Sequence, residues 1–259
     1  MLSRDATDNA RQWLWSVGFA LAGFAGPALA EGEAHWSYRG GTGPSHWGDL
    51  EHEFAACAQG KHQSPIDIKQ AAVKKGHLDP IKFDYRPSAL RIIDNGHTVQ
   101  INYDPGSSIT IGASQYQLVQ FHFHHPSEEK LNGKSFEMVA HLVHKDSQGK
   151  LAVVAVLVRH GKANPLIETL WSNLPHDKGV ERTVEGTQID VATLLPAERS
   201  YYTFAGSLTT PPCSEDVTWY VLRSPVQLSG PEIARFAKLY PMDARPVQPL
   251  NGRVIEAGP

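Results

Sequence analysis

The sequence has little of several features that would point directly to a class of protein. It contains two cysteines among 259 residues, too few for a disulfide-rich scaffold, and a chain of this length can bury a sizeable core without such cross-links. It has no long run of basic residues and a net charge of -3, so we expect no nucleic acid partner. It also lacks internal repeats and low-complexity linkers. The composition, 41% hydrophobic and 20% charged, is that of an ordinary globular protein.

Long apolar runs are also scarce, and the clearest one lies near the N-terminus, over residues 13–25. Two arginines precede it, and small residues in an A-x-A-like cleavage pattern follow at residues 28–30. These features predict a signal peptide over residues 1–30 and a single mature domain over residues 31–259, located in the periplasm or secreted. The alternative is a membrane anchor, but the run is too short to span a bilayer comfortably, so no stable anchor is expected.

The two cysteines, Cys57 and Cys213, both lie in the predicted mature chain. An even number of cysteines in an exported protein favours a disulfide bond, and the alternative is a pair of buried free thiols. The bond would close a long loop, for which the chain-entropy model gives an upper limit of roughly 5 kcal/mol of stabilisation.

Short β-type runs separated by turn signals dominate the chain from about residue 80. The runs that predict strands are residues 89–93, 97–103, 116–124, 136–144, 151–158 and 217–222. Asn132-Gly133 marks a tight turn between two of them. Helical patterns are confined to residues 164–174 and 231–239, with a short turn at 191–195. The prediction is a mainly-β domain of the α+β class, with short helices around one large sheet.

Three histidines form a candidate metal site. His122 and His124 lie two residues apart in one predicted strand, so their side chains share a face of the sheet. His141 lies in the next predicted strand and can join them if the two strands pair. Three neutral imidazoles and a water form a catalytic zinc site, whereas structural zinc sites use four protein ligands, usually including cysteine. The H-x-H spacing alone is weak in a chain with 13 histidines, and His125 and His144, on the opposite face, are predicted to be structural.

Several motifs surround these histidines in a fixed order. They are GPSHW at 43–47, QSPIDI at 63–68, NGH at 95–97, QFHFH at 120–124, PSE at 126–128, AHLVH at 140–144, GSLTTPPC at 206–213, VTW at 217–219 and RPVQPLN at 245–251. Together they resemble the α-class carbonic anhydrases of the bacterial secreted type, and the resemblance covers nearly all of residues 35–255. Their joint order is far more specific than any single motif.

The resemblance implies a twisted, mostly antiparallel sheet of ten strands, with zinc at the bottom of a conical cleft. The implied activity is the reversible hydration of carbon dioxide to bicarbonate and a proton, by attack of a zinc-bound hydroxide. His122, His124 and His141 would hold the Zn²⁺ cofactor. The expected partner is a small-molecule substrate, and a homodimer is compatible with the sequence.

The resemblance also implies roles for residues around the metal. Thr209 would orient the hydroxide, and Glu128 would accept the Thr209 hydroxyl proton, with Glu129 as the alternative acceptor. His97 would export protons, unless it is a surface histidine without a role. The residues that would form an apolar wall for carbon dioxide are Val143, Val153, Leu208 and Trp219. The residues that would form the polar surroundings are Tyr38, Asn95, Gln100, Gln120 and Thr210.

Two positions depart from the family pattern. The family often has a carboxylate two residues before the third histidine, but Val139 stands there and cannot accept a hydrogen bond. We therefore expect His141 to lack this acceptor and zinc to be held less tightly. Asp243 replaces a common asparagine, a smaller change because that position supplies a backbone carbonyl group.

Two other functions are compatible with these residues. One is a non-catalytic, carbonic-anhydrase-like binding domain, which loss of a zinc histidine would mark; all three histidines are present. The other is a zinc esterase, although the sequence has no obvious acyl-recognition motif.

Overall fold

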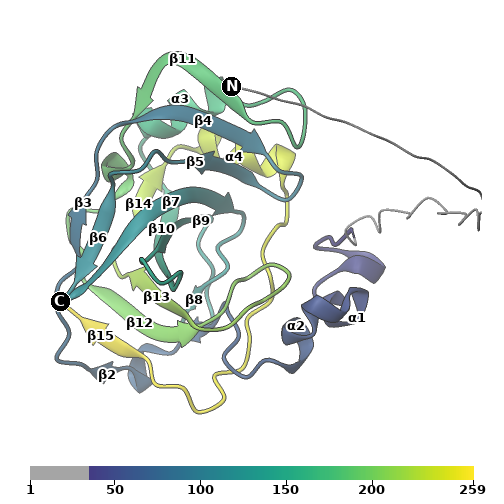
Figure 1. The fold of residues 1–259 in the computed structure, drawn as a ribbon, viewed down its shortest axis with the longest axis vertical. Helices are drawn as coiled ribbons and strands as arrows, with labels where there is room; N and C mark the ends of the chain where they lie inside the picture. Colours follow the sequence, from purple (N-terminus) through teal and green to yellow (C-terminus); the bar gives the residue numbers. More distant parts are fainter. Residues whose placement is uncertain (1–34) are drawn as a thin grey trace, which may run out of the picture. The chain divides into compact units, whose positions relative to one another are not determined.

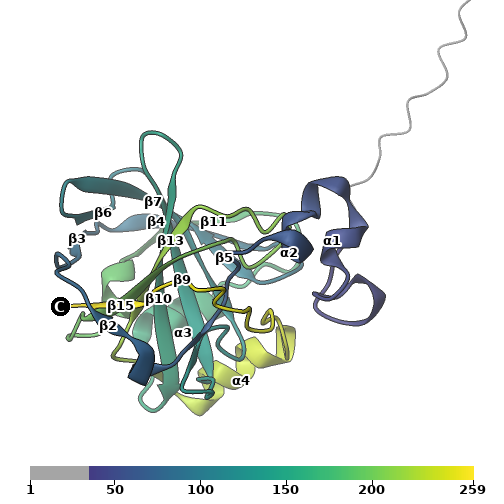
Figure 2. The ribbon, with the colours of Figure 1, turned by 90° about the horizontal axis from the view of Figure 1, so that it is seen from below.

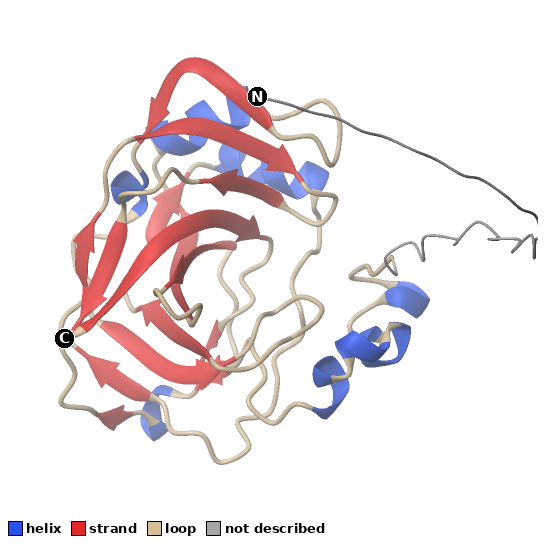
Figure 3. Ribbon diagram, viewed as in Figure 1, coloured by secondary structure: helices blue, strands red, loops and turns tan. Residues whose placement is uncertain are grey.

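One large twisted sheet organises residues 35–259, the part of the chain that this computed structural model describes (Figure 1, Figure 3). The predicted signal peptide, residues 1–30, lies outside the described residues. The thirteen strands of the sheet within residues 35–259 are β2 (Lys74–Lys75), β3 (Lys82–Asp84), β4 (Ser88–Asp94), β5 (Val99–Asn102), β6 (Ser108–Ile111), β7 (Ser114–His124), β9 (Met138–Lys145), β10 (Leu151–His160), β11 (Arg182–Ile189), β12 (Tyr201–Gly206), β13 (Val217–Leu222), β14 (Val226–Leu228) and β15 (Glu256–Gly258). A separate parallel pair joins β1 (Asp67–Ile68) to β8 (Lys130–Leu131).

The main path of the sheet runs in the order β11-β4-β5-β7-β9-β10-β13-β12-β15-β2, and the short strands β3, β6 and β14 pair beside it. This path has ten strands, the number that the resemblance implied. The three short strands beside it bring the sheet to thirteen strands within residues 35–259. Most pairs are antiparallel; β10 runs parallel to β13 and β14, and β15 runs parallel to β2. The prediction of a mainly-β fold on a large, mostly antiparallel sheet is confirmed.

The centre of the sheet is buried on both faces, because apolar side chains of β10 point to both sides. One face packs against two helices, and the ring of Phe123 lies 5.1 Å from that of Trp171 and 6.1 Å from that of Phe236. Burying such an aromatic ring stabilises the fold by roughly 1.5–3 kcal/mol. Since side chains alternate along β7, the phenylalanines of the QFHFH motif face the helices, and the histidines must face the other side.

The helices are short and lie around the sheet (Figure 2). Within the described residues they are the 3-10 helices η1 (Gly40–Thr42), η2 (His52–Phe54), η3 (Gln70–Ala72) and η4 (Val191–Leu194), and the α-helices α1 (Trp47–Leu50), α2 (Ala56–Gln59), α3 (Pro165–Ser172) and α4 (Gly230–Leu239). Helix α3 begins where the Asn164 side chain accepts a hydrogen bond from the Leu166 backbone N–H, and α4 begins with a reciprocal capping box between Ser229 and Glu232. None of the helices described here combines the length and apolarity needed to cross a bilayer.

The predicted elements occur, with shifted ends. Strand β5 begins at Val99 rather than at residue 97, because Asn95 Oδ1 accepts hydrogen bonds from the backbone N–H groups of His97 and Thr98 and closes a turn. The prediction lacks β11, β12 and several short strands. Strand β11 gives no clear signal because it is an edge strand whose residues are mostly exposed and lack an apolar alternation.

Candidate active site

The register of β7 and β9 brings the three histidines together. His122 pairs directly with His141 across the two strands, and Gln100 of β5 pairs with His122 on its other side. His124 shares the face of His122 two residues further along β7. Each of the three histidines offers one ring nitrogen, and these three nitrogens lie within 4.8 Å of one another. The predicted strand pairing is therefore confirmed, and it produces the predicted cluster.

One nitrogen of each imidazole is already held by an oxygen acceptor. The three bonds join His122 Nδ1 to Gln120 Oε1 at 2.8 Å, His124 Nδ1 to the Asp243 carbonyl oxygen at 2.7 Å, and His141 Nε2 to Glu129 Oε2 at 3.2 Å. Because these oxygens accept, the ring nitrogens bonded to them carry the protons. The opposite nitrogen of each ring is left with a lone pair for a metal ion.

The surroundings keep the imidazoles of His122 and His124 neutral. Burial, with a smaller contribution from His141, lowers the pKa of His122 to about 3. Burial and the two neighbouring histidines also lower the pKa of His124 well below its usual value. A metal ion binds the neutral imidazole, so this site is ready for a metal at neutral pH.

The site is enclosed on one side and open on the other. His124 and His141 are each 1% exposed. Partly exposed side chains surround the open side: Gln100, Gln120, His122, Val143, Leu208 and Thr210. Three neutral nitrogen ligands without cysteine, and access from one side, fit a zinc ion that keeps a coordination position for chemistry.

Comparisons with known proteins agree with this geometry. Residues 42–258 match the eukaryotic-type carbonic anhydrase family. The chain belongs to the α-carbonic anhydrase family. A carbonic anhydrase of Nostoc is 43% identical over 257 residues, covering 95% of this chain and 97% of that protein. The protein is thus a carbonic anhydrase, a zinc enzyme that interconverts carbon dioxide and bicarbonate.

Solved structures show the same relationship. The α-carbonic anhydrase of Thermovibrio ammonificans, solved with the inhibitor sulfanilamide, superposes with a TM-score of 0.84 at 42% identity, over 87% of this chain and all (100%) of that one. The α-carbonic anhydrase of Photobacterium profundum gives a TM-score of 0.80 at 42% identity, over 86% of this chain and 100% of that one.

The residues expected to form the apolar wall of this carbonic anhydrase lie together. Val143, Val153 and Trp219 are in register across β9, β10 and β13. Leu208 packs against the same apolar cluster. The Trp219 ring lies 4.9 Å from that of His141, so this cluster reaches the metal site.

Glu128 lies beside the metal-facing nitrogens of two histidines. It is 1% exposed, and its Oε2 is 3.6 Å from His124 Nε2 and 3.8 Å from His141 Nδ1. Its Oε1 accepts a hydrogen bond from the Arg245 backbone N–H at 2.8 Å. Burial and the adjacent Glu129 raise the pKa of Glu128, while the Arg245 N–H and the Thr209 hydroxyl group lower it. The Thr209 hydroxyl group thus acts on the Glu128 pKa, while Glu128 Oε2 has no hydrogen-bond partner among residues 35–259. Glu129 is bonded to His141.

Val139 offers His141 no hydrogen bond, and a residue from a loop offers one instead. Its side chain is fully buried in the apolar cluster that contains Trp219 and, as expected, makes no hydrogen bond. The sequence left open which group accepts from His141 in place of residue 139; it is Glu129, which reaches His141 from the loop before β8. Asp243 supplies its backbone carbonyl as expected, and its carboxyl Oδ1 also accepts from the His125 backbone N–H at 2.7 Å.

His97 lies in the turn between β4 and β5, with its ring stacked on Trp36 at 3.6 Å between centroids. Burial, His35 and Lys178 lower its pKa below the usual 6.5. It lines a pocket of about 270 Å³ that Tyr38 also lines. Burial and the charges of Glu128 and Asp243 raise the pKa of Tyr38.

Two of the polar residues predicted around the site, Asn95 and Gln100, belong to a chain of hydrogen bonds along β5. The exposed Asn95 side chain donates to Gln100 Oε1 at 3.5 Å, and Gln100 Nε2 donates to Asn102 Oδ1 at 2.7 Å. Thr210 lies in the turn after β12, where its carbonyl oxygen accepts from the Cys213 backbone N–H at 2.8 Å.

The predicted disulfide bond between Cys57 and Cys213 is present. The buried Arg245, which the sequence marked only as part of the RPVQPLN motif, reinforces this region. Its guanidinium group donates to the Cys57 carbonyl at 3.0 Å and to Gln63 Oε1 at 2.8 Å. Gln63 in turn donates to the Cys213 carbonyl at 3.0 Å. The disulfide and Arg245 therefore fix the loop that carries Thr209.

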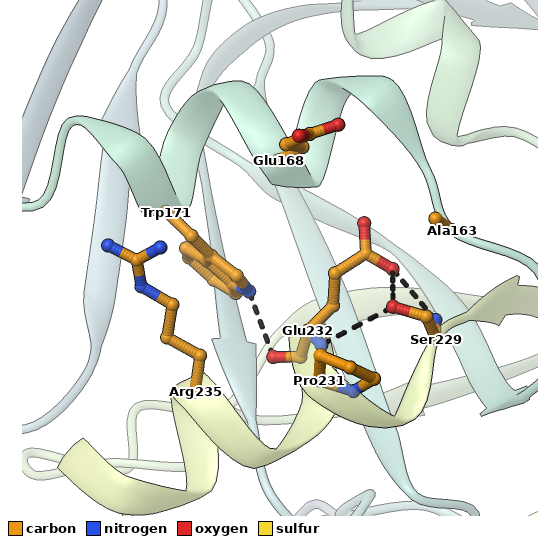
Figure 4. Close-up of a pocket in the computed structure, with 7 residues that line it drawn as sticks. All are labelled: Ala163, Glu168, Trp171, Ser229, Pro231, Glu232 and Arg235. Atoms are coloured by element: carbon orange, nitrogen blue, oxygen red, sulfur yellow. Dashed lines mark hydrogen bonds between the residues drawn. The ribbon is translucent and has the colours of Figure 1, made fainter.

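His144 and a pocket between two helices lie on the helix-covered side of the sheet. His144 is fully buried on the opposite face of β9, and its Nε2 pairs with the Tyr85 hydroxyl at 2.8 Å. A pocket of about 260 Å³ lies between α3 and α4 (Figure 4). There Trp171 donates to the Glu232 carbonyl, and the Glu232 carboxylate caps α4, so these groups are already paired (Figure 4).

Proposed function

We propose that this carbonic anhydrase works through His122, His124 and His141 as zinc ligands, with Thr209, Glu128 and His97 in supporting roles. The convergence of the three imidazoles across β7 and β9 carries this proposal. Zinc held by neutral ligands acts as a Lewis acid that makes water acidic enough to supply hydroxide near neutral pH.

Thr209 and Glu128 orient the attacking hydroxide. A hydroxyl group that donates its proton to a carboxylate can only accept from a second partner. Arg245 occupies Glu128 Oε1, which leaves Oε2, the oxygen nearest the histidines, for Thr209. The positive charge of the metal ion opposes the burial that raises the Glu128 pKa, and so favours the accepting carboxylate.

The row formed by Val143, Val153 and Trp219 receives carbon dioxide. The substrate is small and apolar, so an apolar surface beside the metal holds it without a competing polar site. Attack by a correctly aligned hydroxide then needs little further movement.

His97 carries the product proton outward. Its imidazole titrates below 6.5, so it is neutral and able to accept a proton at neutral pH. Tyr38 supports this route, because it lines the pocket of His97 and also lies near Glu128.

The enzyme acts in the periplasm or is secreted after removal of residues 1–30. The Cys57–Cys213 disulfide supports this location, because such bonds persist in oxidising compartments. N-terminal sequencing of the exported protein tests the cleavage site. A homodimer stays a prediction, and analytical ultracentrifugation tests it.

Metal analysis and carbon dioxide hydration, measured on the same sample, test the proposal. We expect one zinc per chain and hydration that falls in proportion when zinc is removed. An activated ester tested in parallel separates the alternatives. Turnover of the ester alone would favour a zinc esterase, and zinc binding without turnover of either would favour a binding domain.

A further inference from the structure

The acceptor that holds His141 comes from a loop, although the family pattern would place it on the same strand. We propose that Glu129 is the positioning residue for this histidine: it accepts the Nε2 proton and so presents Nδ1 to zinc. Residue 139 is a valine here, and Glu129 supplies the acceptor instead. The inference rests on the proposed function, because it assumes that His141 binds zinc.

The two positions differ in what they can offer His141. Val139 lies two residues before it on β9, on the same face, and pairs with Leu157 of β10 and His124 of β7. Its side chain is fully buried among apolar groups and has no oxygen. Glu129 Oε2 lies 3.2 Å from His141 Nε2, within hydrogen-bond reach.

The backbone around Glu129 is fixed on both sides. The Ser127 hydroxyl donates to the Glu129 carbonyl oxygen at 2.8 Å, and the Lys130 N–H donates to the Ile66 carbonyl oxygen at 3.2 Å. Strand β8, which starts directly after Glu129, pairs with β1. These contacts hold the loop backbone without involving the three histidines, so the carboxylate is positioned at the imidazole by the fold itself.

The charge of Glu129 indicates a role in metal binding beyond packing. His122 and His124 donate to neutral oxygens, an amide and a backbone carbonyl, whereas His141 donates to a carboxylate. Glu129 is fully buried, and among residues 35–259 its side chain makes no other hydrogen bond. A buried carboxylate with one hydrogen bond is costly. A dication on the far side of the imidazole offsets that cost, and the carboxylate makes the ring a stronger ligand.

Zinc release into a chelator tests this inference without relying on activity. The variants are Glu129→Ala, Glu129→Gln, Val139→Glu and the double variant Glu129→Ala/Val139→Glu. The matched control is Glu137→Ala, an exposed glutamate near β9. Circular dichroism of each metal-free protein checks folding, and Glu129→Gln, which keeps the side-chain size, decides the test if Glu129→Ala does not fold.

We expect Glu129→Ala to release zinc about 10–100-fold faster than the parent protein, with Glu129→Gln between them and the control unchanged. The double variant should recover much of the parental rate, because a carboxylate at 139 again reaches His141. Val139→Glu alone should not slow release, since His141 already has an acceptor.

Three results would overturn the inference: parental release from both Glu129 variants, slower release from Val139→Glu alone, or no recovery in the double variant. Hydration by the parent protein is measured beside these rates. An active parent with unaffected Glu129 variants would refute the role of Glu129 and leave the proposed function standing. A zinc-loaded but inactive parent would refute the function, while the release rates would still report on Glu129.

Discussion

His122 and His141 face each other directly across β7 and β9, with ring centroids 5.4 Å apart and planes nearly perpendicular. This pairing turns a two-residue repeat on one strand into a three-ligand site, because His124 already shares the face of His122. A shift of one residue in the register would turn the side chain of His141 to the helix-covered face. The metal site therefore depends on the strand register as much as on the histidines themselves.

Replacing His141 with alanine should remove the metal site. Two remaining imidazoles cannot form the tridentate site, so zinc content should fall from one per chain to near zero and hydration should be abolished. His125→Ala is the matched control, because His125 lies outside the cluster. Metal analysis and hydration assays measure the effect, and an active, zinc-loaded His141→Ala protein would contradict the ligand assignment.

Removing the disulfide should lower both stability and activity. The Cys57→Ser/Cys213→Ser variant loses the cross-link that holds the loop bearing Thr209 and Thr210, and we expect its free energy of unfolding to fall by about 2–5 kcal/mol. Urea titrations and hydration assays at the same temperature check both effects. Parental stability together with parental turnover would show that Arg245 and Gln63 suffice to hold the loop.

His97→Ala should slow proton export without affecting attack on carbon dioxide. In dilute buffer we expect kcat to fall by roughly 10²-fold, the low end for a positioned acid–base group, with kcat/KM nearly intact. Added imidazole should restore kcat. His77→Ala, at an exposed histidine, is the control. If kcat of His97→Ala in dilute buffer equals that of the parent, the proton leaves by another route.

His144 should make the metal-free protein less stable in acid. Burial lowers its pKa from 6.5 to about 3 in the folded state. Between those values the unfolded chain binds one more proton than the folded chain, so the free energy of unfolding falls as the pH falls. The slope is about 1.4 kcal/mol per pH unit, and the loss over the window is on the order of 4 kcal/mol.

The variant His144→Gln should lack this contribution, so urea titrations between pH 3.5 and 7 should give it a shallower slope than the parent. Buried acids such as Glu128 and Asp243 titrate in both proteins, and their effects cancel in the difference. Equal slopes in the two proteins would mean that His144 is accessible to protons in the folded state.

Much of the site was determined by the sequence itself. A strand exposes alternate residues to the same side. The two-residue spacing of His122 and His124 therefore placed them on one face, and the three-residue spacing of His141 and His144 placed these two on opposite faces. The apolar run of β10 predicted a central strand for the same local reason. Two cysteines in a predicted exported chain allowed one internal pairing, and it is the one observed.

The tertiary structure decided which partners Glu128 and Glu129, two adjacent carboxylates, contact. The resemblance favoured Glu128 as the acceptor for Thr209 and left Glu129 as the alternative, because nothing local distinguishes neighbouring loop residues. Their contacts follow from partners far away in the chain: the Arg245 backbone N–H donates to Glu128, and the β1–β8 pair begins directly after Glu129, which is bonded to His141. The sequence could show that Val139 lacks an oxygen, but only the packing of a distant loop could show that another residue supplies it.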